Sequence, residues 1–313
     1  MPSKGKSKKV GIIGAGNVGA SLACYLAEDS LADVVLVDIA EGIPQGKGLD
    51  LLQAGPVRGY DVSITGSNDY KDIAGCDVVV VTAGLPRQPG MSREDLISKN
   101  AQIIGQVTGN VIKFAPEAFL IMVSNPLDIM TYHAFKKSGL SANRVFGQAG
   151  VLDSIRFRTF VAQELNVSAR EVSALVLGGH GDSMVPLPRY TTVNGVPITE
   201  LLPAAKIDAL CQRTRDGGTE IVKYLKTGSA FYAPAAATAE MVEAVLYDRK
   251  KMLPVSALVK GEYGLKDLYI GVPVILGGNG VEKIVELKLS PDEEKALHNS
   301  AKIYRDMLKV LGY

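Results

Sequence analysis

The chain has 313 residues, a length at which about two domains and a large apolar core are expected without support from disulfides. Its 34 basic and 33 acidic side chains leave a formal net charge of +1, so no overall field favours nucleic acid or an anionic membrane surface. A hydrophobic content of 47% and a mean hydropathy of +0.14 exclude a disordered chain.

The first half of the chain alternates short β-branched runs with longer helical stretches. The runs cover residues 10–13, 34–37, 78–81 and 119–123. None shows the alternation of apolar and polar residues that marks a strand with one face in water, so we expect strands that are buried on both faces. Such strands, separated by helical stretches, are typical of right-handed βαβ crossovers. Residues 1–149 are therefore predicted to form an α/β domain with a Rossmann-type, doubly wound parallel sheet.

The second half, residues 150–313, has a different texture. The Asn-Gly pair at 194–195 is a strong two-residue hairpin signal, and Ser290 with Glu293 forms the capping-box signature of a last helix. We predict an α+β substrate domain with antiparallel strands, packed closely against the first domain with a cleft between them. The expected strands are residues 172–177, 185–193, 196–198, 255–259, 272–276 and 281–287, and the expected long helices are residues 204–226 and 229–247.

The cysteines, histidines and apolar runs indicate in which cellular compartment the protein is expected and whether a metal site is expected. Cys24, Cys76 and Cys211 lie far apart without a C-x-x-C pair, which is typical of a reducing compartment. Only three histidines are present, so no metal site is expected. No apolar run approaches the ~20 residues that cross a bilayer, and the basic N-terminal tail shows no signal-peptide pattern. We therefore expect a cytoplasmic protein that binds neither membrane nor nucleic acid.

A glycine-rich turn follows the first expected strand and opens a helical stretch. Gly14 permits a tight turn, Gly16 lets the backbone approach a pyrophosphate, and Gly19 allows close contact between helix and strand. Asp38 ends the next expected strand, about 20 residues beyond the last glycine, where a carboxylate accepts ribose hydroxyls and repels a 2′-phosphate. The combination predicts a site for NAD rather than NADP. The alternative is an ordinary strand–turn–helix with a solvent-facing Asp38.

Three further segments after expected strands combine charge or amide groups with Gly and Pro. Residues 84–93 hold Arg87 and Arg93, residues 123–126 read Val-Ser-Asn-Pro, and His180 stands between glycines. A histidine whose charge changes near neutral pH suits proton transfer in both directions. From the residues alone, His180 is as consistent with a structural role as with a catalytic one. For the two arginines, the residues alone slightly favour charges on a mobile surface loop.

Together with residues 151–156, Val-Leu-Asp-Ser-Ile-Arg, these motifs resemble those of the lactate/malate dehydrogenase family, in order along nearly the whole chain. Within that family, Arg87 stands where malate dehydrogenases have Arg and lactate dehydrogenases have Gln. Residues 228–234 also resemble the lactate dehydrogenase-like type of malate dehydrogenase. The resemblance implies reversible, NAD-dependent hydride transfer between malate and oxaloacetate, a step of the tricarboxylic acid cycle. It also implies a homo-oligomer, either a dimer or a tetramer.

The resemblance further implies a role for each charged side chain. His180 exchanges the hydroxyl proton, and Asp153 hydrogen-bonds its other ring nitrogen and stabilises the imidazolium. Arg156 binds the carboxylate next to the reacting carbon, and Arg87 binds the far carboxylate. Arg93 polarises the reacting C–O bond when the loop closes. The implied cofactor contacts come from the glycine turn, Asp38, Asn17, Val18, Asn100, Val123 and Asn125, with Asn125 bridging to the substrate.

Other interpretations remain open at this stage. A lactate or broader 2-hydroxyacid dehydrogenase shares everything except the site for the second carboxylate. A non-catalytic NAD-binding regulator shares the fold but has no turnover. Asp153 and Arg156 stand three residues apart at an expected helix start, so an ordinary i, i+3 ion pair is a further alternative.

Overall fold

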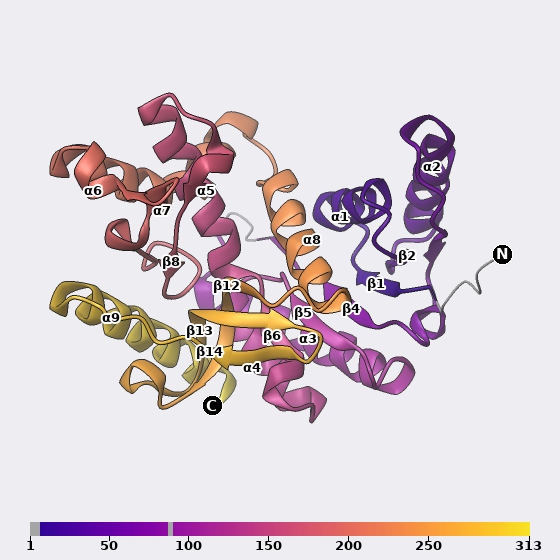
Figure 1. The fold of residues 1–313 in the computed structure, drawn as a ribbon. Coiled ribbons are helices and arrows are strands. Elements are labelled where there is room, and N and C mark those ends of the chain that lie inside the picture. The colour runs from indigo at the N-terminus through magenta and orange to yellow at the C-terminus, as the bar shows by residue number, and fades with distance from the viewer. Residues whose placement is uncertain (1–6, 87–89) are drawn as a thin grey trace.

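The computed structural model describes residues 7–86 and 90–313 (Figure 1). Within these residues the main sheet has nine strands in the order β14-β13-β12-β6-β5-β4-β1-β2-β3. Helices α1 and α2 lie near one end of this sheet and α9 near the other (Figure 1). The molecule is therefore built on one long twisted sheet that runs through both halves of the chain.

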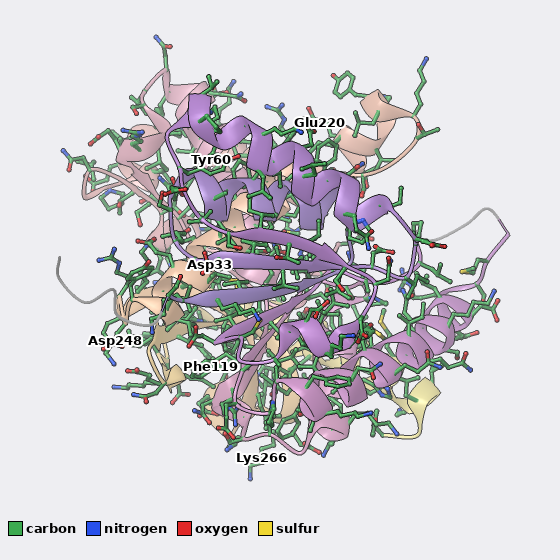
Figure 2. The ribbon with its side chains drawn as sticks, turned by 90° about the vertical axis from the view of Figure 1, so that its right-hand side faces the viewer. Asp33, Tyr60, Phe119, Glu220, Asp248 and Lys266 are labelled. Atoms are coloured by element: carbon green, nitrogen blue, oxygen red, sulfur yellow. The ribbon has the colours of Figure 1, made fainter. Side chains whose placement is uncertain are left out.

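Six parallel strands form the N-terminal part of the sheet, in the order 3-2-1-4-5-6 that defines a Rossmann fold. Helices cover both faces of these strands (Figure 2). The prediction of a doubly wound parallel sheet is thus confirmed. The elements are β1 (Lys9–Ile13), α1 (Asn17–Glu28), β2 (Asp33–Val37), α2 (Ile43–Arg58), β3 (Ile64–Ser67), β4 (Val78–Val81), α3 (Arg93–Phe114), β5 (Phe119–Met122), α4 (Leu127–Ser138) and β6 (Val145–Gly147).

The C-terminal part adds antiparallel strands to the same sheet, and antiparallel strands were predicted for this half of the chain. Strand β12 pairs with β6, where Ser256 stands opposite Gly147. The two halves consequently share a sheet as well as an apolar core. The remaining elements are α5 (Ala149–Leu165), β7 (Val172–Ser173), β8 (Val176–Leu177), β9 (Val185–Pro186), β10 (Thr192–Val193), β11 (Val196–Pro197), α6 (Ile198–Leu201), α7 (Ala204–Leu225), α8 (Tyr232–Leu246), β12 (Lys251–Lys260), β13 (Lys266–Gly277), β14 (Gly280–Ile284) and α9 (Pro291–Leu308).

Local signals for turns and caps correspond closely to the structure. The hairpin between β10 and β11 turns at Asn194 and Gly195, which both have positive φ. Helix α9 begins with the predicted capping box, in which the Ser290 hydroxyl accepts a hydrogen bond from the Glu293 N–H and the Glu293 carboxylate accepts one from the Ser290 N–H.

Several strand predictions in the C-terminal half were wrong in extent. Residues 172–177 form two short strands, β7 and β8, and strands β12 and β13 are longer than the predicted residues 255–259 and 272–276. Residues 185–193 form two short strands, β9 and β10, separated by a 3-10 turn at Pro188–Tyr190. Pro186 and Pro188 have no N–H to donate to a ladder, so an apolar run of this composition does not continue as one strand. Strand β14 ends at Ile284 rather than at residue 287.

Candidate active site

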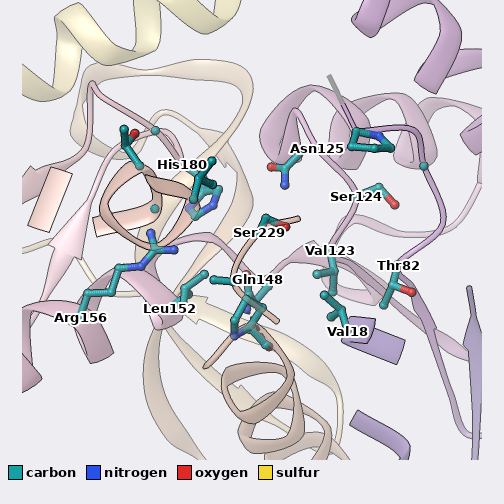
Figure 3. Close-up of a pocket in the computed structure, with 18 of the residues that line it drawn as sticks. Val18, Thr82, Val123, Ser124, Asn125, Gln148, Leu152, Arg156, His180 and Ser229 are labelled. Atoms are coloured by element: carbon teal, nitrogen blue, oxygen red, sulfur yellow. Dashed lines mark hydrogen bonds between the residues drawn. The ribbon is translucent and has the colours of Figure 1, made fainter. Parts of the chain in front are cut away.

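A cleft of about 550 Å³ lies between the two halves of the chain (Figure 3). Arg156 and His180 are on one side of it, and Val18, Thr82 and Ser124 are on the other. The first group belongs to the C-terminal half and the second to the Rossmann half. A ligand in this cleft therefore contacts both halves of the chain.

The glycine turn at the start of α1 is shaped by two different demands. Gly14 has φ of +109°, and a Cβ there would lie 2.5 Å from the Thr82 hydroxyl oxygen, while a Cβ on Gly19 would lie 1.9 Å from the Gly14 carbonyl oxygen. These two positions have no room for a side chain. Gly16 differs, because a Cβ there would meet nothing within 4 Å. The open space in front of the helix N-terminus fits a pyrophosphate.

Asp38 is half-buried directly after β2 and is anchored to the same turn. Its carboxylate accepts hydrogen bonds from the Ala15 N–H at 2.6 Å and from the Ala40 N–H at 2.9 Å. A negative charge fixed beside the open end of α1 suits the ribose hydroxyls of NAD and opposes a 2′-phosphate. The residues present therefore fit the dinucleotide predicted from the sequence.

Asn100 of α3 connects the loops that follow β4 and β5. It is 1% exposed, and its side-chain amide donates to the carbonyl oxygens of Leu85 and Asn125 while accepting from the Leu85 N–H. Asn125 and Val123 line the cleft, whereas Asn100 does not. Asn100 thus acts on the cleft through the loops that it holds.

His180 lines the cleft and pairs with Asp153, which is buried. His180 Nδ1 lies 2.9 Å from Asp153 Oδ2, and the Asp153 carboxylate also accepts a hydrogen bond from Arg156 Nη1 at 3.1 Å. Burial by itself lowers the pKa of His180, but the charge and hydrogen bond of Asp153 outweigh it, so the pKa lies above its usual value. Nδ1 is engaged by the carboxylate, which leaves Nε2 as the ring nitrogen for a ligand.

Arg156 is positioned along the cleft by α7 as well as by Asp153. A Cβ on Gly217 would lie 3.0 Å from Arg156 Cδ, so a side chain at this position of α7 would crowd the arginine. Among the described residues, the buried Nε of Arg156 has no hydrogen-bond partner. A buried guanidinium N–H without an acceptor at a cleft wall suits an anionic ligand such as a carboxylate.

The structure describes only one of the two loop arginines. Arg87 lies outside the described residues, so its predicted contact with a second carboxylate is untested. Arg93 is the exposed first residue of α3, held there by a capping box from Ser92 to Asp95. It does not line the cleft in this structure, and its predicted contact with the substrate stays a prediction.

The other two histidines occupy different surroundings. His133 Nδ1 lies 2.9 Å from the hydroxyl of Tyr313, and His298 Nε2 lies 2.8 Å from the Tyr263 carbonyl oxygen. Neither lines the cleft that contains His180.

Sequence reasoning missed a set of buried groups behind His180. Asp128 of α4 accepts a hydrogen bond from the His180 backbone N–H, and Tyr304 of α9 donates its hydroxyl to the His180 carbonyl. Ser256 of β12 donates to Asp128. An acidic residue in the first turn of a helix is common, since it interacts favourably with the helix dipole. Its position alone therefore gave no reason to single out Asp128.

The fold and this cleft define an NAD-binding oxidoreductase. Residues 8–147 match the family model for the NAD-binding domain of lactate/malate dehydrogenases, and residues 150–310 match the model for their α/β C-terminal domain. The chain belongs to the lactate/malate dehydrogenase family.

Individual relatives cover almost the entire chain. A malate dehydrogenase of Thermomicrobium roseum is 58% identical over 304 residues, which are 97% of this chain and 98% of that protein. The crystal structure of Cryptosporidium parvum malate dehydrogenase superimposes with a TM-score of 0.95 at 43% identity, covering 98% of this chain and 99% of that one. A Cryptosporidium parvum lactate dehydrogenase in complex with lactic acid and nicotinamide adenine dinucleotide gives 0.95 at 47% identity, covering 98% of both chains.

Proposed function

We propose that this protein catalyses the reversible, NAD-dependent interconversion of (S)-malate and oxaloacetate. The observation that carries the proposal is the group formed by His180, Asp153 and Arg156, which places a proton-transfer side chain beside a carboxylate-binding one. Full-length relatives named malate dehydrogenase support the choice of reaction. The glycine turn and Asp38 provide the site for the cofactor.

The proposed mechanism assigns proton transfer to His180. Bound NAD supplies the hydride acceptor, and NADH the donor in the reverse direction. As the C2 hydride of malate leaves, His180 Nε2 takes the hydroxyl proton and becomes an imidazolium. Asp153 holds the ring through Nδ1–H and stabilises that positive charge. In the reverse direction the imidazolium returns its proton to the oxygen of the oxaloacetate keto group.

Substrate binding is proposed to use three arginines and an amide. Arg156 binds the carboxylate next to the reacting carbon, for which its Nε–H is available. Arg87 binds the second carboxylate, as the family pattern implies. Arg93 polarises the reacting C–O bond, and Asn125, which lines the cleft, bridges substrate and nicotinamide.

Initial rates of NADH oxidation with oxaloacetate and with pyruvate test this function. We expect turnover with oxaloacetate to exceed turnover with pyruvate by a wide margin. A preference for pyruvate would instead support a lactate or broader 2-hydroxyacid dehydrogenase. NADH binding without turnover of either keto acid would support the non-catalytic regulator.

We also propose that the protein is a cytoplasmic homo-oligomer, a dimer or a tetramer, acting in the tricarboxylic acid cycle. Helix α2 supports the oligomer, because several of its large apolar side chains face solvent in the single chain. They are Ile43, Leu49, Leu52 and Val57. Light scattering should give a mass of two or four chains. Within the described ranges, every helix is too short or too polar to cross a membrane.

A further inference from the structure

Asp128 is a buried carboxylate that links three separate segments. It is 1% exposed and stands at the second position of α4, just after the loop that carries Asn125. Its Oδ2 accepts the backbone N–H of His180 at 2.8 Å, and its Oδ1 accepts the hydroxyl of Ser256 at 2.6 Å. One side chain of the Rossmann half therefore holds both strand β12 and the loop of residues 178–184 between β8 and β9, called the histidine loop below.

The charge of Asp128 is not needed for these hydrogen bonds. A neutral amide oxygen also accepts a backbone N–H, though more weakly, and its NH₂ group can donate to the Ser256 hydroxyl, whereas an ionised carboxylate is costly to bury. Among the residues that the structure describes, no cation forms a salt bridge with Asp128, so its compensation comes from two hydrogen bonds and the start of α4. What a carboxylate adds here, beyond an amide, is a negative charge close to His180.

We propose that Asp128 is a positioning residue for His180, and that its negative charge acts with that of Asp153 to stabilise the protonated imidazole. This inference rests on the proposed function in so far as the imidazolium is the proton donor to the keto acid. Asp153 acts on the ring nitrogen directly. Asp128 holds the backbone N–H of the same residue, and its charge acts on the ring through space.

The electrostatics around His180 agree with this geometry. Burial, the strongest influence, lowers the pKa of His180; Asp153 raises it, Arg156 lowers it, and Asp128 raises it. Burial also raises the pKa of Asp128 to about 6, so the carboxylate is ionised at neutral pH. The charged or titratable groups facing this region are Asp153 and Arg156 of α5, Asp128 of α4, Tyr304 of α9, Asp182 of the histidine loop, Arg93 of α3 and Arg215 of α7.

The charge of Asp128 should set the pH range in which each reaction direction proceeds. Reduction of the keto acid requires protonated His180, so it is lost as pH rises through the pKa of that histidine. Oxidation of malate requires neutral His180, so it is lost as pH falls through the same pKa. Without the charge of Asp128 the imidazolium is less stable, and both limits move to lower pH.

The decisive variant is Asp128→Asn, which keeps the shape and a hydrogen-bond acceptor but removes the charge. The chain has three histidines, so ¹³C labelling of their Cε1 atoms gives three resonances, and His180→Asn identifies the one from His180. We expect the pKa read from this resonance to fall by about half a pH unit or more in Asp128→Asn. The alkaline limit of kcat/KM for oxaloacetate should fall by the same amount.

Ser300→Ala is the matched control. The Ser300 hydroxyl oxygen accepts the backbone N–H of Gly179, next to His180, at 2.9 Å, and it carries no charge. Its loss loosens the same loop, so kcat is expected to fall while the pKa of His180 stays in place. If both variants lower kcat and neither moves that pKa, Asp128 has only a structural role and the proposal is overturned.

Ser256→Ala keeps the inference testable if Asp128→Asn does not fold. This variant removes the hydroxyl that donates to Asp128, which raises the pKa of that carboxyl and weakens its charge. A smaller downward movement of the His180 pKa is expected, and an unchanged value contradicts the proposal. The resonance titration needs no turnover. An inactive unsubstituted protein would refute the proposed function while leaving the role of Asp128 to be decided by the titration.

Discussion

His180 is the proposed proton carrier, so its substitution is the most direct test of the mechanism. General acid–base catalysis contributes typically ~10² to 10⁴ in rate, so His180→Asn should lower kcat by about that factor. NADH binding should survive, because the glycine turn and Asp38 belong to the other half of the chain. Steady-state kinetics and NADH fluorescence measure the two effects separately.

The matched control for this substitution is His298→Asn, at an exposed histidine that does not line the cleft. It should retain near-normal turnover. If His180→Asn also retained it, the assignment of the proton carrier would be wrong. Loss of NADH binding together with turnover would point to misfolding of that variant.

Arg87 is predicted to decide between two keto acids, on the basis of its position in the sequence. A hydrogen bond to a charged group is worth ~1.5 to 3 kcal/mol, and ~1.4 kcal/mol is a factor of ten. Arg87→Gln should therefore lower kcat/KM for oxaloacetate about ten- to a hundredfold. It should raise the value for pyruvate, whose methyl group leaves a guanidinium without a partner. An unchanged ratio of the two specificity constants would remove the main residue-level support for malate over lactate.

The sequence revealed residues that a motif presents together and missed residues that only the fold brings together. His180 stands out because glycines flank it, and Asp153 and Arg156 stand out because they share one segment. Asp128 lies 52 residues from His180 and 128 residues from Ser256, and its place in a helix start looks ordinary. No local pattern indicates that these three groups meet. The pairing of β12 with β6 places Ser256, and the bridge between Gly178 and Gly271 of β13 places the loop of His180.

Among the elements, α7 carries a glycine in its interior next to Arg156, although glycine lowers the stability of a helix. Glycine in a helix interior is about 1 kcal/mol less favourable than alanine, yet Gly217 is buried against Arg156. Gly217→Ala would place a Cβ 3.0 Å from Arg156 Cδ, below ordinary carbon–carbon contact. We expect the guanidinium to shift and KM for oxaloacetate to rise roughly three- to tenfold.

Gly109→Ala in α3 is the control for that prediction. Gly109 also lies inside a long helix, but a Cβ there meets nothing within 4 Å. This variant should gain helix stability without any change in KM. Equal KM values for the two variants would show that the glycine of α7 does not set the position of Arg156.

Strands were predicted correctly from the sequence where every residue of the strand is buried. Strand β4 consists of four valines that are all fully buried, and its apolar run is unbroken. Strands β3 and β6 were not singled out, since they have four and three residues and each contains a glycine. Such short segments pair because their neighbours in the sheet are already in place, which is information that a local window does not hold.

At the scale of the whole molecule, the shared sheet predicts cooperative unfolding. Strand β12 pairs with β6 across the junction of the two halves, and the larger apolar cluster contains residues from β1 to α9. Loss of either half would expose the core and the sheet edge of the other, so calorimetry should show a single transition. NADH at about 100 times its Kd should stabilise this transition by roughly 2.7 kcal/mol, although most of its contacts are expected in the Rossmann half. Two resolved transitions, of which only the first responds to NADH, would show instead that the halves unfold independently and that the β12–β6 junction contributes little to the stability of the active cleft.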